Sequence, residues 1–166
     1  MFAKMRTLSI AALLTAAIAA PALAGPPWIS IEYPVNPHDQ SMRGAMLLVH
    51  VFHHSTPIAS PMEGTAEGIV NGERRSVKLA FTETSRPGVY GLSRQWGTEG
   101  VWTLVIRMSR TEGGTESATA VVELGTDGEI ASVRVPTRQE GGWTIPTDVS
   151  MTEIDQALRT RAGKRA

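Results

Sequence analysis

The amino-acid sequence predicts an all-β fold: an immunoglobulin-like antiparallel β-sandwich of seven or eight strands with a short C-terminal α-helix. Three observations carry this prediction. Apolar residues recur with a period of two from Trp28 onward, turn dipeptides separate the alternating segments, and a capped, helix-like stretch lies near the end of the chain. Seven or eight short strands in about 110 residues are typical of a sandwich. A small barrel is the alternative.

The N-terminus has the order of a secretory signal peptide. Basic residues precede an uncharged run over residues 8–20, and the small-residue pattern Ala-Leu-Ala follows at 22–24. The run is about 13 residues, whereas roughly 20 are needed to span a bilayer. We therefore expect cleavage before Gly25, a periplasmic location, and no transmembrane anchor after cleavage. Residues 1–24 are left out of the expected fold.

The strand pattern is clearest in residues 101–108, VWTLVIRM, where alternate positions from Trp102 onward are apolar. We expect a half-buried strand here, with Trp102 in the core, Tyr90 packed near it, and the intervening residues facing water. The same test places the other strands. The full set of expected strands is 28–33, 44–53, 66–70, 74–82, 88–95, 101–109, 117–124 and 129–135.

Turn chemistry separates these strands. Asn71-Gly72 and Asp127-Gly128 are signals for two-residue hairpins of type I′, and Pro87-Gly88 and Gly113-Gly114 mark further turns. Hairpin connections of this kind favour antiparallel neighbours.

The composition changes after Pro136. Residues 137–149, TRQEGGWTIPTDV, are rich in glycine, proline and polar side chains, and they predict a connecting segment that crosses the surface. Trp143 in this segment lies near a predicted element end, where it could be exposed for binding or could fill the rim of the sandwich. We thus expect three parts: the signal peptide, a sandwich over 25–136, and a linker with a helix and basic tail over 137–166.

The predicted helix follows Ser150. Ser150 and Glu153 have the spacing of a capping box, and Met151, Ile154 and Leu158 fall on one face. A helix of about 11 residues is too short to be stable alone, so this face must dock. We expect it to dock on its own sandwich, and docking on a partner protein is the alternative.

Composition excludes several classes of protein. The chain has no cysteine, which removes disulfides, thiolate zinc sites and cysteine nucleophiles. Its formal net charge is +0, so no global positive field attracts nucleic acid. A local basic tail is expected to be solvated, with contact to an anionic lipid or protein surface as the alternative. The tail contains Arg159, Arg161, Lys164 and Arg165.

Three of the four histidines lie within residues 50–54. In one continuous strand, His50 and His54 share a face but lie roughly 13 Å apart, whereas ligands of one metal converge at about 2 Å. Two imidazoles could meet only if the strand ends near Phe52 and His53 and His54 curl back through the next loop.

Such a turn would give a low-coordinate site based on His53 and His54. His38, Met42 or Met62 could complete it, and imidazole with thioether ligands would suit copper. The alternative interpretation is an exposed strand end and loop without a metal.

Signatures of enzymes are absent from the sequence. It contains no Gly-x-Ser-x-Gly elbow, no His-Glu-x-x-His helix and no phosphate-binding glycine loop. Ser55, His54 and Asp39 could be assembled into a triad, but a chain of this size offers such a set by chance. We predict that the protein is not an enzyme, and a hydrolase is the least favoured function.

The segment RPGVYGLSRQWGTEGVWTLVI, residues 86–106, resembles the signature of YtkA-like and FixH-like exported domains. In these domains a Gly-x-Tyr at a strand start is followed by Gly-x-Trp-x-Leu in the next strand. The matching residues are Gly88, Tyr90, Gly100, Trp102 and Leu104. Upstream, LLVHVFHHSTPI resembles the family's apolar strand that ends in a turn before Pro-Ile or Pro-Val. The resemblance covers about residues 44–109.

The resemblance implies a β-sandwich without catalysis of its own. FixH-like members are membrane-anchored and linked to copper handling during oxidase assembly. This chain has His53-His54-Ser55 where the family often has an Asp-Gly turn. The sequence therefore favours a non-enzymatic periplasmic binding or accessory module whose partner is another exported or membrane protein, and a copper-handling protein is the alternative.

Overall fold

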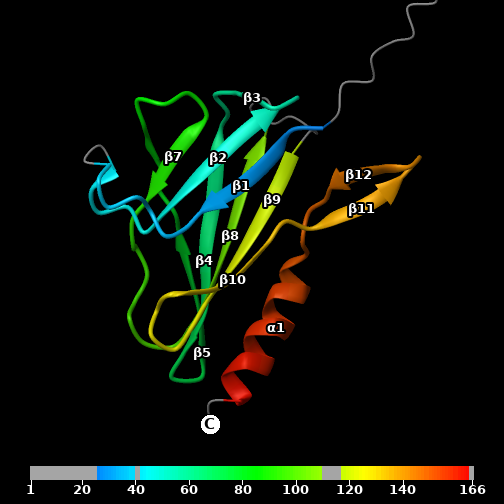
Figure 1. Cartoon of the computed structure of the whole chain (residues 1–166). Helices are drawn as coiled ribbons and strands as arrows, with labels where there is room; N and C mark the ends of the chain where they lie inside the picture. The colour runs from blue at the N-terminus through cyan, green and yellow to red at the C-terminus, as the bar shows by residue number, and fades with distance from the viewer. Residues whose placement is uncertain (1–25, 40–41, 110–116, 165–166) are drawn as a thin grey trace, which may run out of the picture.

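The computed structural model describes residues 26–39, 42–109 and 117–164, and it confirms the all-β, sandwich-like fold (Figure 1). These residues form twelve strands, all paired antiparallel, and one C-terminal helix, α1 (Met151–Gly163). The expected signal peptide and its cleavage point lie outside the described residues. No described helix has the length and apolar character needed to cross a membrane.

Two five-stranded sheets make the sandwich. The first has the order β1-β2-β7-β6, with β3 paired to β2, and the second has the order β10-β9-β8-β4-β5. The strands of the first sheet are β1 (Trp28–Glu32), β2 (Leu47–His53), β3 (Thr56–Pro57), β6 (Thr82–Glu83) and β7 (Val89–Leu92). The strands of the second are β4 (Met62–Val70), β5 (Glu73–Lys78), β8 (Val101–Ser109), β9 (Ser117–Leu124) and β10 (Ile130–Arg134).

This strand order corresponds to the immunoglobulin arrangement. The first sheet follows the order A-B-E-D, and the second follows G-F-C with a neighbouring C′ strand. Because the described strands form two facing sheets without pairing between them, the fold is a sandwich and the barrel alternative is wrong.

The core lies between the two sheets and is apolar. Trp102 and Tyr90 are both buried in it, as the sequence predicted, and Trp96 joins them. Gly68, opposite Trp102 on β4, leaves room for the indole, because a Cβ there would lie 2.5 Å from Trp102 Cε3. The fully buried side chains with the largest volumes include Ile29, Leu47, Leu92, Leu104, Ile106 and Met108.

The residues predicted to form turns do so in the structure. Asn71 and Gly72 adopt φ angles of 51° and 82°, the left-handed pair that a type I′ hairpin requires. Gly88 and Gly128 also have positive φ. The structure adds the short strands β3 and β6 to the expected set and starts β4 at Met62. The predicted turn at 113–114 lies outside the described residues.

The outer face of the second sheet is less exposed to solvent than predicted. Thr103 and Val105, expected to face water, are buried, because α1 packs across this face. The helix is capped by Ser150 and Glu153 as predicted, and it docks on its own sandwich through Ile154 and Leu158. The strand at 101–109 is therefore buried on both faces.

Two further predictions for the C-terminal region were wrong in detail. Met151 was placed on the buried helix face, yet 47% of it is exposed, because it lies in the first turn beyond the contact with the sheet. Arg161 was assigned to a solvated tail, but it reaches back onto the sandwich. It donates to the Thr103 hydroxyl at 2.7 Å and to the Trp102 and Leu124 carbonyls.

The expected surface linker also proved to be ordered as a hairpin. Residues 137–146 form β11 (Thr137–Glu140) and β12 (Trp143–Pro146), which pair with each other and with no other described strand. The physical reason is the Gly141-Gly142 pair, whose φ angles of 56° and 82° close a tight antiparallel turn. In Figure 1 this hairpin projects from the body beside β9 and above α1.

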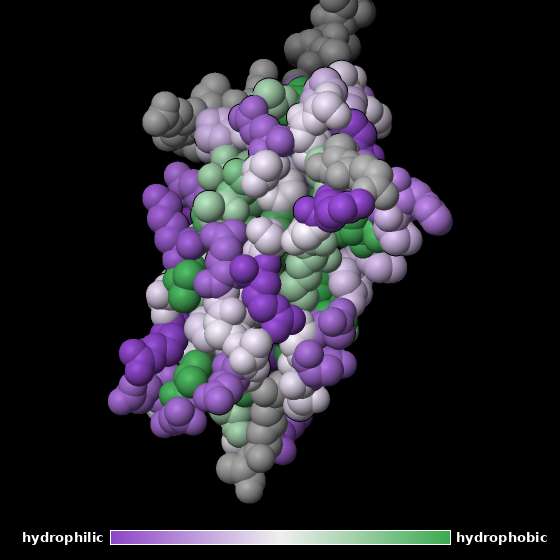
Figure 2. All heavy atoms as spheres, turned by 90° about the vertical axis from the view of Figure 1, so that its left-hand side faces the viewer, coloured by the Kyte–Doolittle hydropathy of each residue, from purple (hydrophilic) through white to green (hydrophobic). Residues whose placement is uncertain are grey.

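Among the described residues, the side of the molecule near β7 shows no large apolar surface (Figure 2). Figure 2 shows small apolar patches there, separated by polar side chains. Such scattered exposure is normal for the surface of a folded domain.

Candidate functional site

The histidine pair lies in the turn between β2 and β3. The strand ends at His53, and His54 and Ser55 have φ angles of 50° and 63°, so they form the two turn residues. Thr56 then pairs back with His53. The turn stacks the imidazole rings of His53 and His54, with centroids 4.1 Å apart and planes inclined by 22°.

This stacking limits what the pair can bind. The lone pair of an imidazole nitrogen lies in the ring plane, so ligands of one ion must converge on it at about 2 Å. Stacked rings direct their lone pairs side by side instead. A shared ion would therefore require one ring to rotate. The Nε2 atom of His53 is buried and has no hydrogen-bond partner.

The other proposed ligands lie on different elements. His38 is in the loop after β1, where its backbone N–H donates to Asn36 Oδ1 at 3.0 Å. Met62 opens β4 opposite Met108 and packs against the core, and Met42 is buried in a satellite cluster over the first sheet. Within the described ranges, no three or more His, Asp or Glu side chains form a group that could hold a metal. Copper binding stays a prediction.

His50 is separate from this pair, as the strand geometry predicted. It lies on β2 with its Nε2 atom 2.7 Å from Glu32 Oε2 on the neighbouring β1. Of the chance triad, Ser55 is a turn residue and Asp39 lies 3.7 Å from the Arg86 guanidinium. These contacts do not support a catalytic role for the three residues.

The residues that carry the family resemblance have structural functions. The Ser60 N–H donates to the Tyr90 hydroxyl at 2.8 Å, and this hydroxyl donates to the Ser60 carbonyl at 2.9 Å. Tyr90 thus ties β7 to the connection before β4. Gly88 has a φ of 70°, and a Cβ there would lie 2.6 Å from the Val51 carbonyl oxygen.

The residues of the second half of the motif, Gly100 and Trp102, also have structural functions. Gly100 has a φ of 89° and lies against the backbone of Ile69, so a side chain would collide with it. The indole N–H of Trp102 donates to the Glu99 carbonyl at 2.6 Å, which fixes the ring over Gly68. The motif therefore specifies the sandwich and carries no direct information about a ligand.

The β11–β12 hairpin, called the arm below (residues 137–146), is largely exposed. All four residues of β11 are exposed, and 64% of Trp143 is accessible on β12. Polar contacts hold the arm's own shape: Gln139 Nε2 donates to Thr144 Oγ1 at 2.8 Å, and Arg138 pairs with Glu140 at 2.8 Å. The arm thus presents a large aromatic side chain on a nearly neutral ribbon.

Hydrogen bonds anchor the root of the arm to the body. Thr147 N–H donates to the Pro136 carbonyl at 2.9 Å, which closes the ribbon where it leaves the body. Asp148 then accepts from Thr119 at 2.7 Å and from Arg107 at 3.1 Å. These contacts fix the direction of the arm relative to the second sheet.

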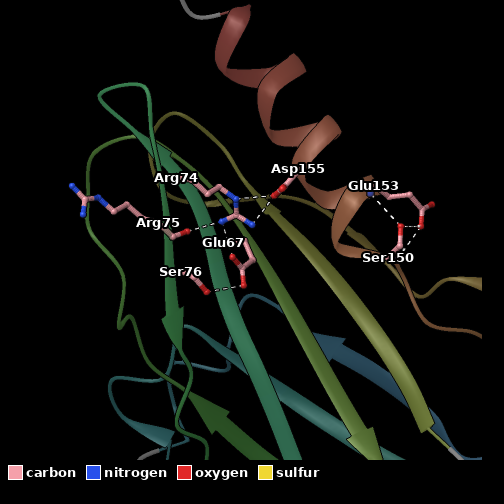
Figure 3. Close-up of polar contacts among 7 residues, drawn as sticks. All are labelled: Glu67, Arg74, Arg75, Ser76, Ser150, Glu153 and Asp155. Carbon is pink, nitrogen blue, oxygen red and sulfur yellow. Dashed lines mark hydrogen bonds and ion pairs between the residues drawn. The ribbon is translucent and has the colours of Figure 1, made fainter.

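An ionic network with one buried member, Glu67, joins α1 to the second sheet (Figure 3). Only 3% of Glu67 is exposed, and its carboxylate pairs with Arg74 at 2.6 Å and accepts from Ser76 at 2.9 Å. Arg74 also reaches Asp155 on α1 at 2.7 Å. Burial disfavours the charged guanidinium, but the bonds to Asp155 and Glu67 outweigh it, so the pKa of Arg74 is raised.

Comparisons of the chain with protein-family models, curated proteins and solved structures returned no match. The resemblance to YtkA-like and FixH-like domains therefore stays a prediction.

Sequence reasoning missed the arm although a signal was present. Gly-Gly between two short segments of polar and apolar residues is a hairpin pattern, and here it is Gly141-Gly142 between Arg138–Glu140 and Trp143–Ile145. The abundance of glycine and proline was interpreted as irregular structure instead. Trp143 was recognised as a residue that could be exposed for binding, but the ribbon that presents it was not.

Proposed function

We propose that this protein is a non-enzymatic periplasmic accessory module that binds another exported or membrane protein through the arm. The observation that supports this most directly is the exposure of Trp143 on a projecting two-stranded ribbon. Tryptophan contributes more binding energy at protein interfaces than most residues, because a large rigid ring is buried at small entropic cost.

The ribbon itself suits such a role. An isolated two-stranded hairpin is marginally stable in water, so a partner that covers it would add order as well as contacts. In the described part of the chain, the outer edges of β11 and β12 pair with no other strand, which leaves backbone groups for strand addition by a partner. The signal peptide predicted from the N-terminal sequence supports a partner outside the cytoplasm.

Site-specific photo-crosslinking tests this function. A photoreactive phenylalanine analogue is placed at position 143, and the matched control is placed at Arg75, an exposed residue on β5. Irradiation of cells should give a discrete adduct of one exported protein from position 143 and not from position 75. No adduct from position 143, or the same adducts from both positions, would contradict the proposal.

Copper handling is the second candidate, because the turn brings two imidazoles together and leaves the buried His53 Nε2 without a partner. Cu(I) and Cu(II) titrations of the unmodified protein, His50→Ala, and the double variant His53→Ala with His54→Ala test it. Tight binding that only the double variant loses would support a site at the turn. Equally weak binding by all three proteins would leave the turn as a structural feature.

A further inference from the structure

A groove of about 630 Å³ opens on the outer face of the second sheet, beside the start of α1. Its volume falls within the range of small-molecule binding sites. The helix covers one part of this face, and the groove is the adjoining part, bounded by the residues that lead into the helix. The side chains that matter for binding come from β4, β5, β8 and the first helical turn.

The floor of the groove carries charges that the fold does not neutralise. The strand register places Glu63 opposite Arg107, and the ion pair that Arg107 makes is with Asp148, to which its Nε donates at 3.1 Å. Lys78 stands opposite Thr65. Among the described residues, neither Glu63 nor Lys78 makes an ion pair, so one carboxylate and one ammonium face the same groove without a partner.

The deeper carboxylate of the groove is different. Glu67 is buried, and both its oxygens are occupied by Arg74 and Ser76. Glu67 therefore helps to attach the helix through Arg74, and the charged groups left to bind a ligand are those of Glu63 and Lys78. Removing Glu67 would disturb the fold, whereas Glu63 and Lys78 can be changed at little structural cost.

One wall of the groove is apolar. Val105 and Val149 are buried beneath it, and the thioether side chain of Met151 is 47% exposed at its rim. Methionine adapts its shape to different apolar partners, so it suits a surface that receives a variable side chain. The groove thus combines an anionic point, a cationic point and an adaptable apolar wall.

We propose that this groove binds short peptides with free termini. The peptide ammonium would pair with Glu63, its carboxylate with Lys78, and an apolar side chain would lie against Met151. Glu63 and Lys78 occupy diagonal positions on β4 and β5, which places their Cα atoms roughly 7–8 Å apart. The charged groups lie at the ends of long side chains, so both can reach the termini of a dipeptide or tripeptide, which spans about 7–10 Å.

This inference does not depend on the arm, because the two surfaces use different residues. The test is calorimetric and NMR titration of the mature chain with Ala-Leu-Ala, and with its N-acetylated and C-amidated forms. We expect saturable binding of the free peptide, and weakening by about three- to tenfold for each blocked terminus, because each block removes one charge-assisted contact.

Matched variants assign the two contacts. Glu63→Gln should weaken binding of the free peptide, and N-acetylation of the peptide should then cause no further loss of affinity. Lys78→Met should likewise weaken binding, and C-amidation should then cause no further loss. Glu73→Gln and Arg75→Met make equivalent charge changes elsewhere on β5 and should leave binding unchanged. The melting temperatures of all variants should be close to that of the unmodified protein. Absence of saturable binding, or binding that ignores Glu63, Lys78 and the blocked termini, would overturn the proposal.

Discussion

The arm and α1 follow one another along the C-terminal part of the chain, and they differ in how they are stabilised. Neither a two-stranded ribbon nor a helix of 13 residues is stable alone in water. The helix docks: Leu158 is fully buried and Arg161 bonds to three groups of the second sheet. The arm remains exposed from β11 to Trp143.

This difference indicates which element belongs to the folded body and which is presented by it. The helix supplies a missing layer over the second sheet, and without it Val101, Val105 and Val121 would face water. The arm covers nothing of comparable size. We therefore expect substitutions in the helix to change stability, and substitutions at the tip of the arm to change binding alone.

The largest expected effect is that of Leu158→Ala. This substitution removes a fully buried side chain from the contact between α1 and β8, and such truncations cost about 2–5 kcal/mol. Urea unfolding should show a corresponding fall in the free energy of unfolding. An unchanged midpoint would mean that the helix is not part of the cooperative unit.

A smaller loss is expected for Arg161→Ala. The Trp102 and Leu124 carbonyls and the Thr103 hydroxyl would lose a charged donor, which should cost about 1–3 kcal/mol. Arg159→Ala, at an exposed position two residues earlier, is the control and should change stability by less than about 0.5 kcal/mol. Equal losses for the two arginines would contradict the specific docking of Arg161.

The stability that the helix cap provides should depend on pH. The Ser150 backbone N–H donates to the Glu153 carboxylate, as does the Ser150 hydroxyl, and these bonds lower the pKa of Glu153 below its usual 4.5. Because the folded pKa is lower than the unfolded one, this stabilisation is present above pH 4.5 and is lost as pH falls through the folded pKa.

Glu153→Gln should therefore melt lower than the unmodified protein at pH 7, and the two melting temperatures should converge in acid. Melting followed by circular dichroism between pH 7 and pH 3 measures this. A difference that stays constant over that interval would show that the carboxylate charge does not contribute to the cap.

The smallest effect on stability is expected for Trp143→Ala. The indole is mostly exposed, so its removal should change the free energy of unfolding by less than about 0.5 kcal/mol. The same urea experiment that detects Leu158→Ala measures it. A loss comparable to that of a core residue would mean that Trp143 packs against the body and that the arm is not a free surface.

Much of this structure could be predicted from local patterns. The period-two segments located most strands, Asn71-Gly72 located a hairpin, and Ser150 with Glu153 located the helix start, because each depends on neighbours along the chain. Predictions of exposure failed where a distant segment intervened. Val105 was expected to face water, and α1, more than forty residues later, covers it.

The candidate sites show the same division. The sequence placed His53 and His54 at the end of a strand and separated His50 from them, since strand pitch alone determines this. It could not show that the two rings stack, because that depends on the φ angles of His54 and Ser55 in the turn. The sequence did not predict the groove, since its lining residues come from three strands, the helix and the segment before it.

The sequence by itself determined the fold class, the turns, the capped helix and the absence of any thiol chemistry, because these follow from composition and from residues close in the chain. Only the tertiary structure decided that Arg161 is a docking residue, that among the described residues Glu67 is ion-paired while Glu63 and Lys78 are not, and that the strands of the arm pair with no other described strand. These properties depend on which distant groups come within hydrogen-bond distance, and local periodicity contains no information about that.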